Sequence, residues 1–445
     1  MKKIKMMIKE RYPSIFLWLK TLAHHLFGPY RVARQRLKAW KGSQWQKSVI
    51  SSEAEKITKV RDKEILRILF VVIHRSTWKT DTLYNILKKD PKFSPCIIVA
   101  PDTRDSPEWS KIEQNEAFKS FSEKGYEVYL GSLKDDENRV LIQGIGPDII
   151  IFNNPHDRVR PSLRECLLED YISCYIPYHI EVGNYGGNLP QYNQVFHNAI
   201  WKIFSPHAVS KNTYNQVADR KGKNVIVTGY PGLEAIIYGD KSEHDPWKKR
   251  GLKRIIWAPH HSIDMPSLPY SNFLRYAEIF REAVDKYSDE VQWCFKPHPL
   301  LKPKLLKHSD WGHARTEEYF DFWENHTNTQ IEQGEYHSLF RNSDAMVHDS
   351  GSFLAEYIYV NKPVMYLWSS EQLPDFFNQF GNEALDACQR GNNATNIHEF
   401  ISSVIEGRDI GQLTRQAFLE NNPVKVSGML PSERIVLELK REIFE

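Results

Sequence analysis

Short runs of apolar residues alternate with longer amphipathic stretches along most of this chain, in two successive blocks. The first block opens with the apolar run 68–73 and the second with the run 254–258. Because such runs, separated by helix-length segments, are typical of parallel strands joined by crossover helices, each block predicts a doubly wound parallel sheet. The turn residues Gly229–Gly232 and the polar stretch 239–251 separate the blocks. The sequence therefore predicts two Rossmann-like domains that face a cleft, with ligands bound at the carboxyl ends of the strands.

The chain length supports this division, because 445 residues suit two domains of about 200 residues each. The strands expected in the first block lie at residues 68–73, 96–100, 126–130, 148–152, 174–176, 202–204 and 224–228. Those expected in the second block lie at residues 254–258, 291–295, 330–331, 345–347 and 364–367. The predicted divisions are an arm over 1–60, a first domain over 61–230, a second domain over 231–410 and C-terminal helices over 411–445. A return of these last helices to the first domain is one possible arrangement.

Basic charge is concentrated at the N-terminus. Residues 1–48 contain 12 Lys and Arg and a single acid, Glu10, whereas the rest of the chain contains 47 basic and 55 acidic residues. Apolar and aromatic residues are interleaved with the bases, which favours a helical arm that lies on an anionic membrane surface. Docking of the arm on the protein's own acidic surface is the alternative. Nucleic-acid binding is not expected, because no nucleic-acid module accompanies the arm.

The location of the protein follows from what the sequence does not contain. No run of 18 or more apolar residues occurs, and the N-terminus lacks the pattern of a secretory signal. The five cysteines are scattered and form no CxxC pair, which favours a reducing compartment over a disulfide framework or a zinc site. The sequence therefore predicts a cytoplasmic protein that is peripheral on the inner face of the cell membrane.

The strongest local signal for a binding site is the run 345–357, AMVHDSGSFLAEY. An apolar strand is followed by Asp349 and by the small residues of the turn Ser350-Gly351-Ser352, which opens a helix. Free N–H groups and the helix dipole at such a turn attract an anion. Glu356, one turn further along, is a candidate acceptor for a ribose hydroxyl. An ordinary Ser-capped helix beside a buried Asp is the alternative interpretation.

Two further polar segments directly follow strands of the second block. In the segment KPHP, two prolines stiffen the loop that carries Lys296 and His298, and this pair suits the neutralisation of phosphate charge. His260 and His261 follow another strand and are expected to line the cleft as phosphate-binding residues. A metal site is not expected there, because no third ligand lies at a recognisable spacing in the sequence.

The first block offers a candidate for proton transfer. The segment 175–188 is rich in Gly and aromatic residues and follows a strand, as an acceptor loop would. His179 in this segment is the first candidate for a general base, since histidine titrates near neutral pH. His74, the segment 153–156 and His207 also follow predicted strands, which places them near the cleft.

Several motifs are missing from the sequence. It contains no GxGxxG, no GxxxxGK[ST] and no DxD pair. Dinucleotide and ATP sites therefore lose support, no cofactor is expected, and a metal-chelated nucleotide-sugar site is not expected. The charge of a nucleotide diphosphate would be met by helix N-termini, Lys, Arg and His.

The second block resembles the CDP-glycerol glycerophosphotransferase family, which includes the teichoic-acid glycerophosphate polymerases of cell-wall biosynthesis. The family motif SDYSSxFFDY followed by KP is similar to Asp349–Ser352, Glu356-Tyr357 and Lys362-Pro363 of this chain. Lys296–Pro299 resembles the family's K-[LI]-HP motif, and Gly229–Pro231 resembles its G-[YF]-P turn. The family's acceptor-side WHG tripeptide is absent, and the segment YIPYHI that contains His179 would take its place.

This resemblance implies a GT-B fold and a transferase. The enzyme would move a polyol-phosphate, such as glycerol- or ribitol-phosphate, from a CDP-activated donor to a hydroxyl of a cell-surface glycan or lipid-linked acceptor. His179 would act as the base, while Lys296 and His298 would stabilise the phosphate charge. One alternative is a metal-independent GT-B glycosyltransferase that uses a nucleotide-sugar in capsule, O-antigen or wall-polymer synthesis. The other is a non-catalytic subunit of a capsule assembly complex.

Overall fold

The computed structural model describes residues 42–104, 106–239, 245–249, 251–334, 336–368 and 376–445. The chain divides into two compact units, residues 1–54 and 55–445, and both predicted sheets lie in the second unit. The predicted basic arm falls largely on residues 1–41, which lie outside the described residues. Among the described residues, no helix has both the length and the apolar character needed to cross a bilayer.

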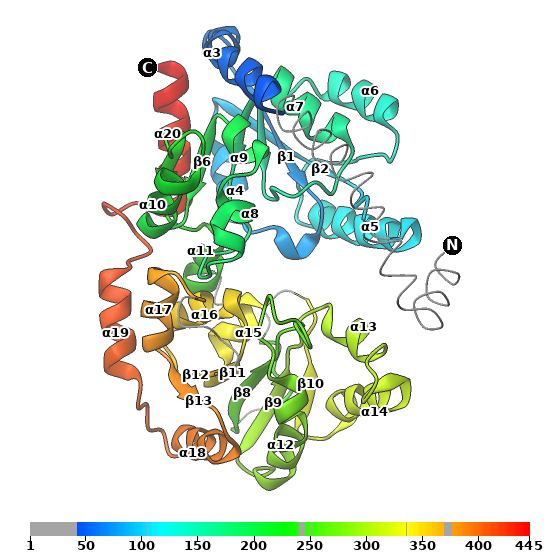
Figure 1. The fold of residues 1–445 in the computed structure, drawn as a ribbon, viewed down its shortest axis with the longest axis vertical. Coiled ribbons are helices and arrows are strands. Elements are labelled where there is room, and N and C mark those ends of the chain that lie inside the picture. The colour runs from blue at the N-terminus through cyan, green and yellow to red at the C-terminus, as the bar shows by residue number, and fades with distance from the viewer. Residues whose placement is uncertain (1–41, 105, 240–244, 250, 335, 369–375) are drawn as a thin grey trace, which may run out of the picture. The chain divides into compact units, whose positions relative to one another are not determined.

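The first sheet is built from seven parallel strands in the order β3-β2-β1-β4-β5-β6-β7 (Figure 1). Its strands are β1 (Leu66–Val72), β2 (Phe93–Val99), β3 (Val128–Leu130), β4 (Ile149–Phe152), β5 (Ile172–Tyr175), β6 (Lys202–Ser205) and β7 (Val225–Val227). All residues of β1 except Arg67 are buried, as expected where helices cover both faces of a parallel sheet. The predicted strands are confirmed, although β1, β2 and β5 begin earlier than expected.

The second sheet has six parallel strands in the order β10-β9-β8-β11-β12-β13. Its strands are β8 (Lys253–Ala258), β9 (Val291–Phe295), β10 (Thr329–Ile331), β11 (Ala345–His348), β12 (Val364–Leu367) and β13 (Gln389–Gly391). Strand β13 was not expected from the sequence. In both sheets the chain starts in the middle, builds one side and then builds the other. The order therefore reverses between β1 and β4 and between β8 and β11, and ligands of doubly wound sheets bind at such points.

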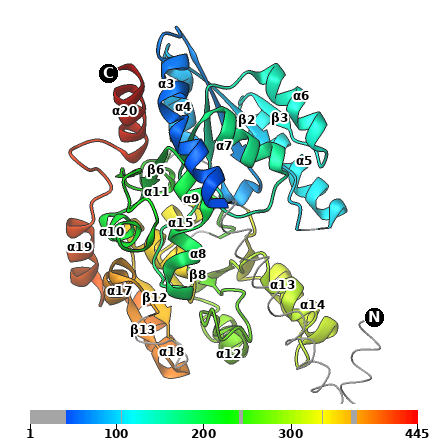
Figure 2. The same cartoon turned by 45° about the horizontal axis from the view of Figure 1, so that its top comes forward.

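Helices connect the strands and cover the sheets (Figure 2). In chain order, the helices before the second sheet are α3 (Glu53–Arg61), α4 (Asp81–Lys89), α5 (Pro107–Glu123), α6 (Asp135–Ile145), α7 (Glu165–Asp170), α8 (Leu189–Tyr192), α9 (Val195–Ala199), α10 (Ala208–Val217) and α11 (Gly232–Tyr238). Those that follow are α12 (Phe273–Lys286), α13 (Leu301–Leu305), α14 (Gly312–Asn325), α15 (His337–Asn342), α16 (Gly351–Glu356), α17 (Gln379–Asp386), α18 (Ala394–Ile405), α19 (Gln412–Asn421) and α20 (Pro431–Phe444). The 3-10 helices are η1 (Arg75–Thr77), η2 (Pro161–Leu163), η3 (Gly186–Asn188) and η4 (Tyr357–Val360).

Each sheet with the helices that pack on it is called a lobe, the first lobe being built on the first sheet and the second lobe on the second. The last helix, α20, packs in the first lobe although it ends the chain. Its apolar face, which includes Ile435, Leu439 and Ile443, is part of the same buried cluster as β1 and α4. Its first turn is fixed by Glu234, whose carboxylate accepts hydrogen bonds from the amide and the hydroxyl of Ser432 at 2.7 and 2.8 Å. The end of the chain therefore returns from the second sheet to the first.

The segment 175–188 joins the two lobes. The amide of Asn184 donates to the carbonyl of Phe376 at 2.8 Å, and the Asn378 side chain donates to the Glu181 carbonyl at 2.7 Å. Tyr185 and Tyr270 share a hydrogen bond of 2.6 Å between their hydroxyls. The loop expected to hold the acceptor is thus attached to the second lobe.

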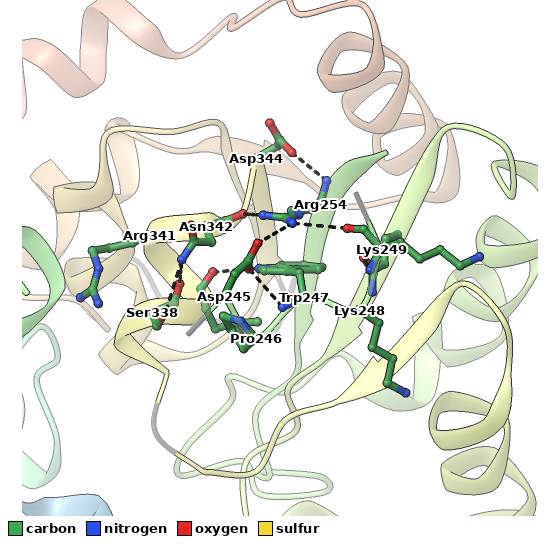
Figure 3. A network of polar contacts seen from close by, with 12 residues as sticks. Asp245, Pro246, Trp247, Lys248, Lys249, Arg254, Ser338, Arg341, Asn342 and Asp344 are labelled. Atoms are coloured by element: carbon green, nitrogen blue, oxygen red, sulfur yellow. Dashed lines mark hydrogen bonds and ion pairs between the residues drawn. The ribbon is translucent and has the colours of Figure 1, made fainter. Parts of the chain in front are cut away.

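The edge at which the strands of the second sheet begin carries a network of paired charges (Figure 3). The Arg254 guanidinium donates to Asp245 at 2.7 Å and to the Asn342 carbonyl at 3.2 Å, and the Arg254 amide donates to Asp344 at 2.8 Å. Trp247 packs under the guanidinium, 5.8 Å from ring centre to charge. The network ties the segment before β8 to the start of β11.

Candidate functional site

Three loops meet at the opposite edge of the second sheet, where its central strands end. Because β8 pairs with both β9 and β11, the residues that follow these three strands become neighbours. His260 and His261 follow β8, Lys296 and His298 follow β9, and Asp349 follows β11. The residues predicted for the site from separate parts of the sequence are therefore brought to one place.

His260, His261 and His298 form a compact group. One ring nitrogen from each lies within 4.8 Å of those from the other two. The ring centres are 4.3 Å apart for His260 and His261, 5.2 Å for His260 and His298, and 4.2 Å for His261 and His298. The three imidazoles can therefore act on a single small ligand.

Hydrogen bonds determine which ring nitrogen of each histidine carries the proton. The Leu300 amide donates to Nδ1 of His298 at 3.1 Å, and the Lys304 ammonium donates to Nδ1 of His261 at 2.9 Å. The amide of Ser262 donates to Nδ1 of His260 at 3.3 Å. Because amides and ammonium groups can only donate, Nδ1 is the acceptor in each ring and the proton of the neutral ring is on Nε2. The group therefore offers three Nε2–H donors.

This arrangement suits an anion better than a metal ion. The expectation that His260 and His261 lack a third partner was wrong, because His298 from the next loop supplies one. A bound metal needs a nitrogen lone pair from each ring, and a metal-bound histidine normally donates a hydrogen bond from its other ring nitrogen. In this group Nδ1 accepts instead, so Nε2 holds a proton that a phosphate oxygen can accept. The donor set therefore does not fit a metal ion.

Burial keeps the three histidines uncharged. It lowers the pKa of His260 well below its usual value, that of His261 to about 4 and that of His298 to about 3. At neutral pH the rings therefore act as N–H donors and not as positive charges. An entering phosphate dianion would raise these pKa values, because an adjacent opposite charge favours the protonated ring.

Asp349 holds the site together. Its carboxylate accepts the His260 amide at 2.6 Å and the Asn272 amide at 2.5 Å, and its side chain is fully buried. Burial raises the pKa of Asp349 to about 7, against the opposing effect of the Asn272 and His260 amides. Each oxygen is bonded to a backbone amide, so Asp349 positions the histidine loop.

The turn after Asp349 leads into α16 as predicted, with Ser350 at the N-cap position. The helix is short, and the Ser350 amide already donates to Nδ1 of His348 at 3.2 Å, so a contribution of this turn to anion binding would rest on the N–H groups of Gly351 and Ser352. Gly351 is required by close packing, because a Cβ there would come within 2.5 Å of the Tyr270 hydroxyl. Tyr270 in turn packs edge-on against His260, with ring centres 5.0 Å apart. The turn and the histidine group are therefore parts of one site.

Lys296 and Glu356 lie in a second buried cluster that includes Tyr336 and Lys79. Tyr336 donates to the Glu356 carboxylate and accepts from the Lys79 ammonium at 2.9 Å. The Lys296 ammonium lies 5.2 Å from the Tyr336 ring centre and donates to the Gly334 carbonyl at 3.2 Å. Burial lowers the pKa of Lys296 to about 8. Burial also raises the pKa of Glu356, although the positive charges of Lys79 and Lys296 act to lower it. Sequence reasoning missed Tyr336 and Lys79.

No carboxylate of the described residues orients His179, the predicted base. Its ring packs against Tyr178 at 4.6 Å, and its Nδ1 is buried without a hydrogen-bond partner among the described residues. Burial, with a smaller contribution from His156, lowers the pKa of His179 to about 4. His207 is structural, because its Nε2 bonds the Glu181 carbonyl at 3.0 Å and its ring stacks on Phe380.

Comparison with known proteins supports the fold. No family model matches the chain, and no curated protein matches its sequence. Among solved structures, a complex of S. aureus MnaA with UDP superposes with a TM-score of 0.57 at 16% identity, over 85% of this chain and 97% of the other. UDP-GlcNAc 2-epimerase from Neisseria meningitidis, bound to UDP-GlcNAc, gives a TM-score of 0.53 at 16% identity, over 84% and 100%.

A third structure is a variant of the wall teichoic acid polymerase TagF soaked with CDPG. It superposes with a TM-score of 0.56 at 11% identity, over 93% of this chain and 97% of the TagF chain. At these identities the likeness concerns the fold alone. This chain therefore has the GT-B fold that the sequence predicted, with two Rossmann-like domains built on parallel sheets.

Proposed function

We propose that the protein is a transferase that moves a polyol-phosphate from a CDP-activated donor to an acceptor hydroxyl, with release of CMP. The observation that carries this proposal is the group of three Nε2–H donors on His260, His261 and His298. Three donors on rings whose centres lie 4.2 to 5.2 Å apart suit the oxygens of a phosphate whose charge grows in the transition state. The sequence resemblance and the CDPG-soaked TagF neighbour give independent support for a cytidine diphosphate donor.

The two buried clusters divide the donor between them. The histidine group and the turn Ser350-Gly351-Ser352 would hold the diphosphate, with Lys296 close enough to supply positive charge. Glu356 would exchange its hydrogen bond from Tyr336 for one from a ribose hydroxyl. Fixed donors can stabilise developing phosphate charge, and the sequence contains no DxD pair, so we expect the proposed reaction to proceed without a divalent metal.

Purified protein incubated with CDP-glycerol, CDP-ribitol and a set of nucleotide-sugars tests the proposal through the nucleotide released. We expect CMP from one CDP-polyol, at a rate that survives EDTA. Loss of all activity in EDTA, restored by magnesium or manganese, would contradict the metal-free mechanism. Absence of CMP release with every CDP-polyol would contradict the proposed function.

A glycosyltransferase that uses a nucleotide-sugar is the second candidate. Its support is that structures holding UDP or UDP-GlcNAc superpose on this chain about as well as TagF does. The same panel separates the two reactions, because a sugar nucleotide would release a nucleoside diphosphate while a CDP-polyol would release a monophosphate.

The basic N-terminal segment would hold the enzyme on an anionic membrane, close to a lipid-linked acceptor. Its net charge of +11 over residues 1–48, against −8 for the rest, supports this role. We expect the full chain to float with vesicles that contain anionic lipid, and a chain that starts after Ser48 to stay behind. Binding should weaken as salt shortens the screening length from about 10 Å at 0.1 M to about 3 Å at 1 M. Equal flotation of both chains would contradict this role.

A further inference from the structure

A buried ion cluster lies at the edge of the first sheet where its central strands end. His74 follows β1, Asp102 follows β2 and Arg158 follows β4. His74 Nε2 is 3.0 Å from Asp102 Oδ2, and Nε of Arg158 donates to the same oxygen at 2.6 Å. The side chain of Asp102 is 1% exposed, whereas that of His74 is 21% exposed. A buried carboxylate therefore holds a histidine that solvent and substrate can reach.

We propose that His74, oriented by Asp102, is the general base that removes the proton from the acceptor hydroxyl. This inference rests on the proposed function, and it names the group that the transfer reaction needs on the acceptor side of the cleft. Asp102 is a positioning residue, because it acts through His74.

The hydrogen bond fixes the tautomer that a base requires. An ionised carboxylate can only accept, so Nε2 of His74 carries the proton and Nδ1 carries the lone pair. Among the described residues, Nδ1 has no hydrogen bond, and the Glu113 carboxylate oxygen, at 3.9 Å, is beyond hydrogen-bond range. In this part of the chain Nδ1 is therefore available to accept the proton of a bound hydroxyl.

Asp102 remains ionised over the whole working range of pH. Burial by itself would raise the pKa of Asp102, but hydrogen bonds from His74, the Arg104 amide and Arg158 outweigh it and lower the pKa to about 2. The negative charge stabilises the imidazolium that forms when His74 takes up a proton. A carboxylate that orients a histidine base in this way recurs in enzymes on unrelated folds.

The cluster faces the lobe that would hold the donor. Only a few residues separate His74 from Lys79, whose ammonium donates to Tyr336 of the second lobe at 2.9 Å. Tyr336 in turn bonds Glu356, the residue proposed for the ribose. In Figure 1 the segment after β1, which includes η1, lies on the side of the first lobe that is turned towards the second.

His179 is the alternative candidate for the general base. Within the described part of the chain no carboxylate orients its ring, its Nδ1 is buried, and burial lowers its pKa to about 4. His74 has both the orienting carboxylate and the accessible lone pair.

The proposed step transfers one proton and one polyol-phosphate group. The acceptor O–H bond breaks and its proton passes to Nδ1 of His74, while the acceptor oxygen forms a bond to the β-phosphorus. The bond between that phosphorus and the bridging oxygen breaks, and CMP leaves with the electron pair. The imidazolium then releases its proton to water, so that one proton is produced for each CMP.

Steady-state kinetics of CMP release from CDP-glycerol, with free glycerol as the probe acceptor, test the assignment. We expect His74→Ala to lower kcat by about 100- to 10,000-fold with little change in the KM for donor, since general bases contribute about that much. Added imidazole should restore part of the loss. Asp102→Asn should lower kcat as well, because an amide at this position can donate to Nε2 and force the proton onto Nδ1.

The pair His308 and Asp264 provides a matched control. Its Nε2 to Oδ2 distance is 2.9 Å, but it lies on the surface of the second lobe with Asp264 72% exposed. His308→Ala should leave kcat unchanged. Wild-type turnover that persists in His74→Ala but is lost in His179→Ala would overturn the inference. Wild-type protein that releases no CMP from any CDP-polyol would instead count against the proposed function.

Nitrogen-15 NMR of protein labelled at histidine tests the dyad without turnover, with His74→Gln used to assign the signal. We expect the Nε2–H tautomer at His74 in the wild type and a shift towards Nδ1–H in Asp102→Asn. An Nδ1–H tautomer in the wild type would overturn the inference whatever donor the enzyme uses.

Discussion

The two edges of the second sheet both carry polar side chains, but the partners of these side chains differ. At the edge where the strands begin, Arg254 is paired with Asp245 and with backbone carbonyls. At the edge where the strands end, three histidine rings lie together and Lys296 is buried, and burial lowers the pKa of His298 and of Lys296. Pairing of opposite charges stabilises a fold, whereas a group of uncharged N–H donors suits a ligand that brings acceptors. We therefore expect the edge where the strands begin to serve stability and the edge where they end to serve binding.

Loss of His298 should have the largest effect on activity. We expect His298→Ala to reduce CMP release about 100- to 1,000-fold, as removal of one donor to developing phosphate charge does in other enzymes. The midpoint of urea unfolding should change little. His313→Ala is the control, because His313 is an exposed histidine of α14. Equal activity of the two variants would show that the carboxyl edge does not bind the reacting phosphate.

Disruption of the edge where the strands begin should lower stability and leave activity unchanged. Arg254→Met removes the hydrogen bonds to Asp245 and to the Asn342 carbonyl, and hydrogen bonds to charged groups contribute about 1.5–3 kcal/mol each. Because Asp245 is partly exposed and can be rehydrated, we expect a total loss of about 1–3 kcal/mol in the free energy of unfolding. CMP release by the folded fraction should match the wild type. A large loss of activity without a loss of stability would break the distinction between the two edges.

A smaller effect should appear in the pH dependence of stability. Burial lowers the pKa of His348 to about 3, although the Ser350 amide opposes this. Between pH 6.5 and 3 the unfolded chain therefore binds a proton at this residue that the folded chain does not, so stability falls as the pH falls. Between pH 7 and 5 the wild type should lose about 2 kcal/mol relative to His348→Gln. The raised pKa of Asp349 gives a slope of opposite sign, but it is common to both proteins and cancels in the difference.

That difference is measured from urea unfolding at the two pH values. An unchanged difference between wild type and variant would show that His348 titrates normally in the folded protein.

The order of the strands explains how much the sequence could predict. Parallel strands buried on both faces give continuous apolar runs, so β1, β4, β8 and β9 could be recognised directly. Residues that follow such strands necessarily meet at one edge, which is why His260 and His298 could be assigned to one site. Strand β13 has the sequence QRG, with no apolar signal, and was missed.

The partners of individual side chains could not be predicted. Asp349 has the chemistry of a ligand-binding residue, but in the fold two backbone amides take up its oxygens. Tyr336 and Lys79 are 257 positions apart, and only the approach of the two lobes brings them together. Asp102 carried no signal of its own, because its role depends on the position of His74 on a neighbouring strand.

The central claim is that the carboxyl edge of the second sheet binds the diphosphate of a cytidine nucleotide. A crystal structure of the protein with CDP tests this claim most directly. The predicted result is a phosphate within hydrogen-bond distance of Nε2 of His298 and His260 and of the segment Ser350–Ser352, with a ribose hydroxyl on Glu356. Nucleotide density confined to the first lobe, or a phosphate that contacts none of the three histidines, would contradict it.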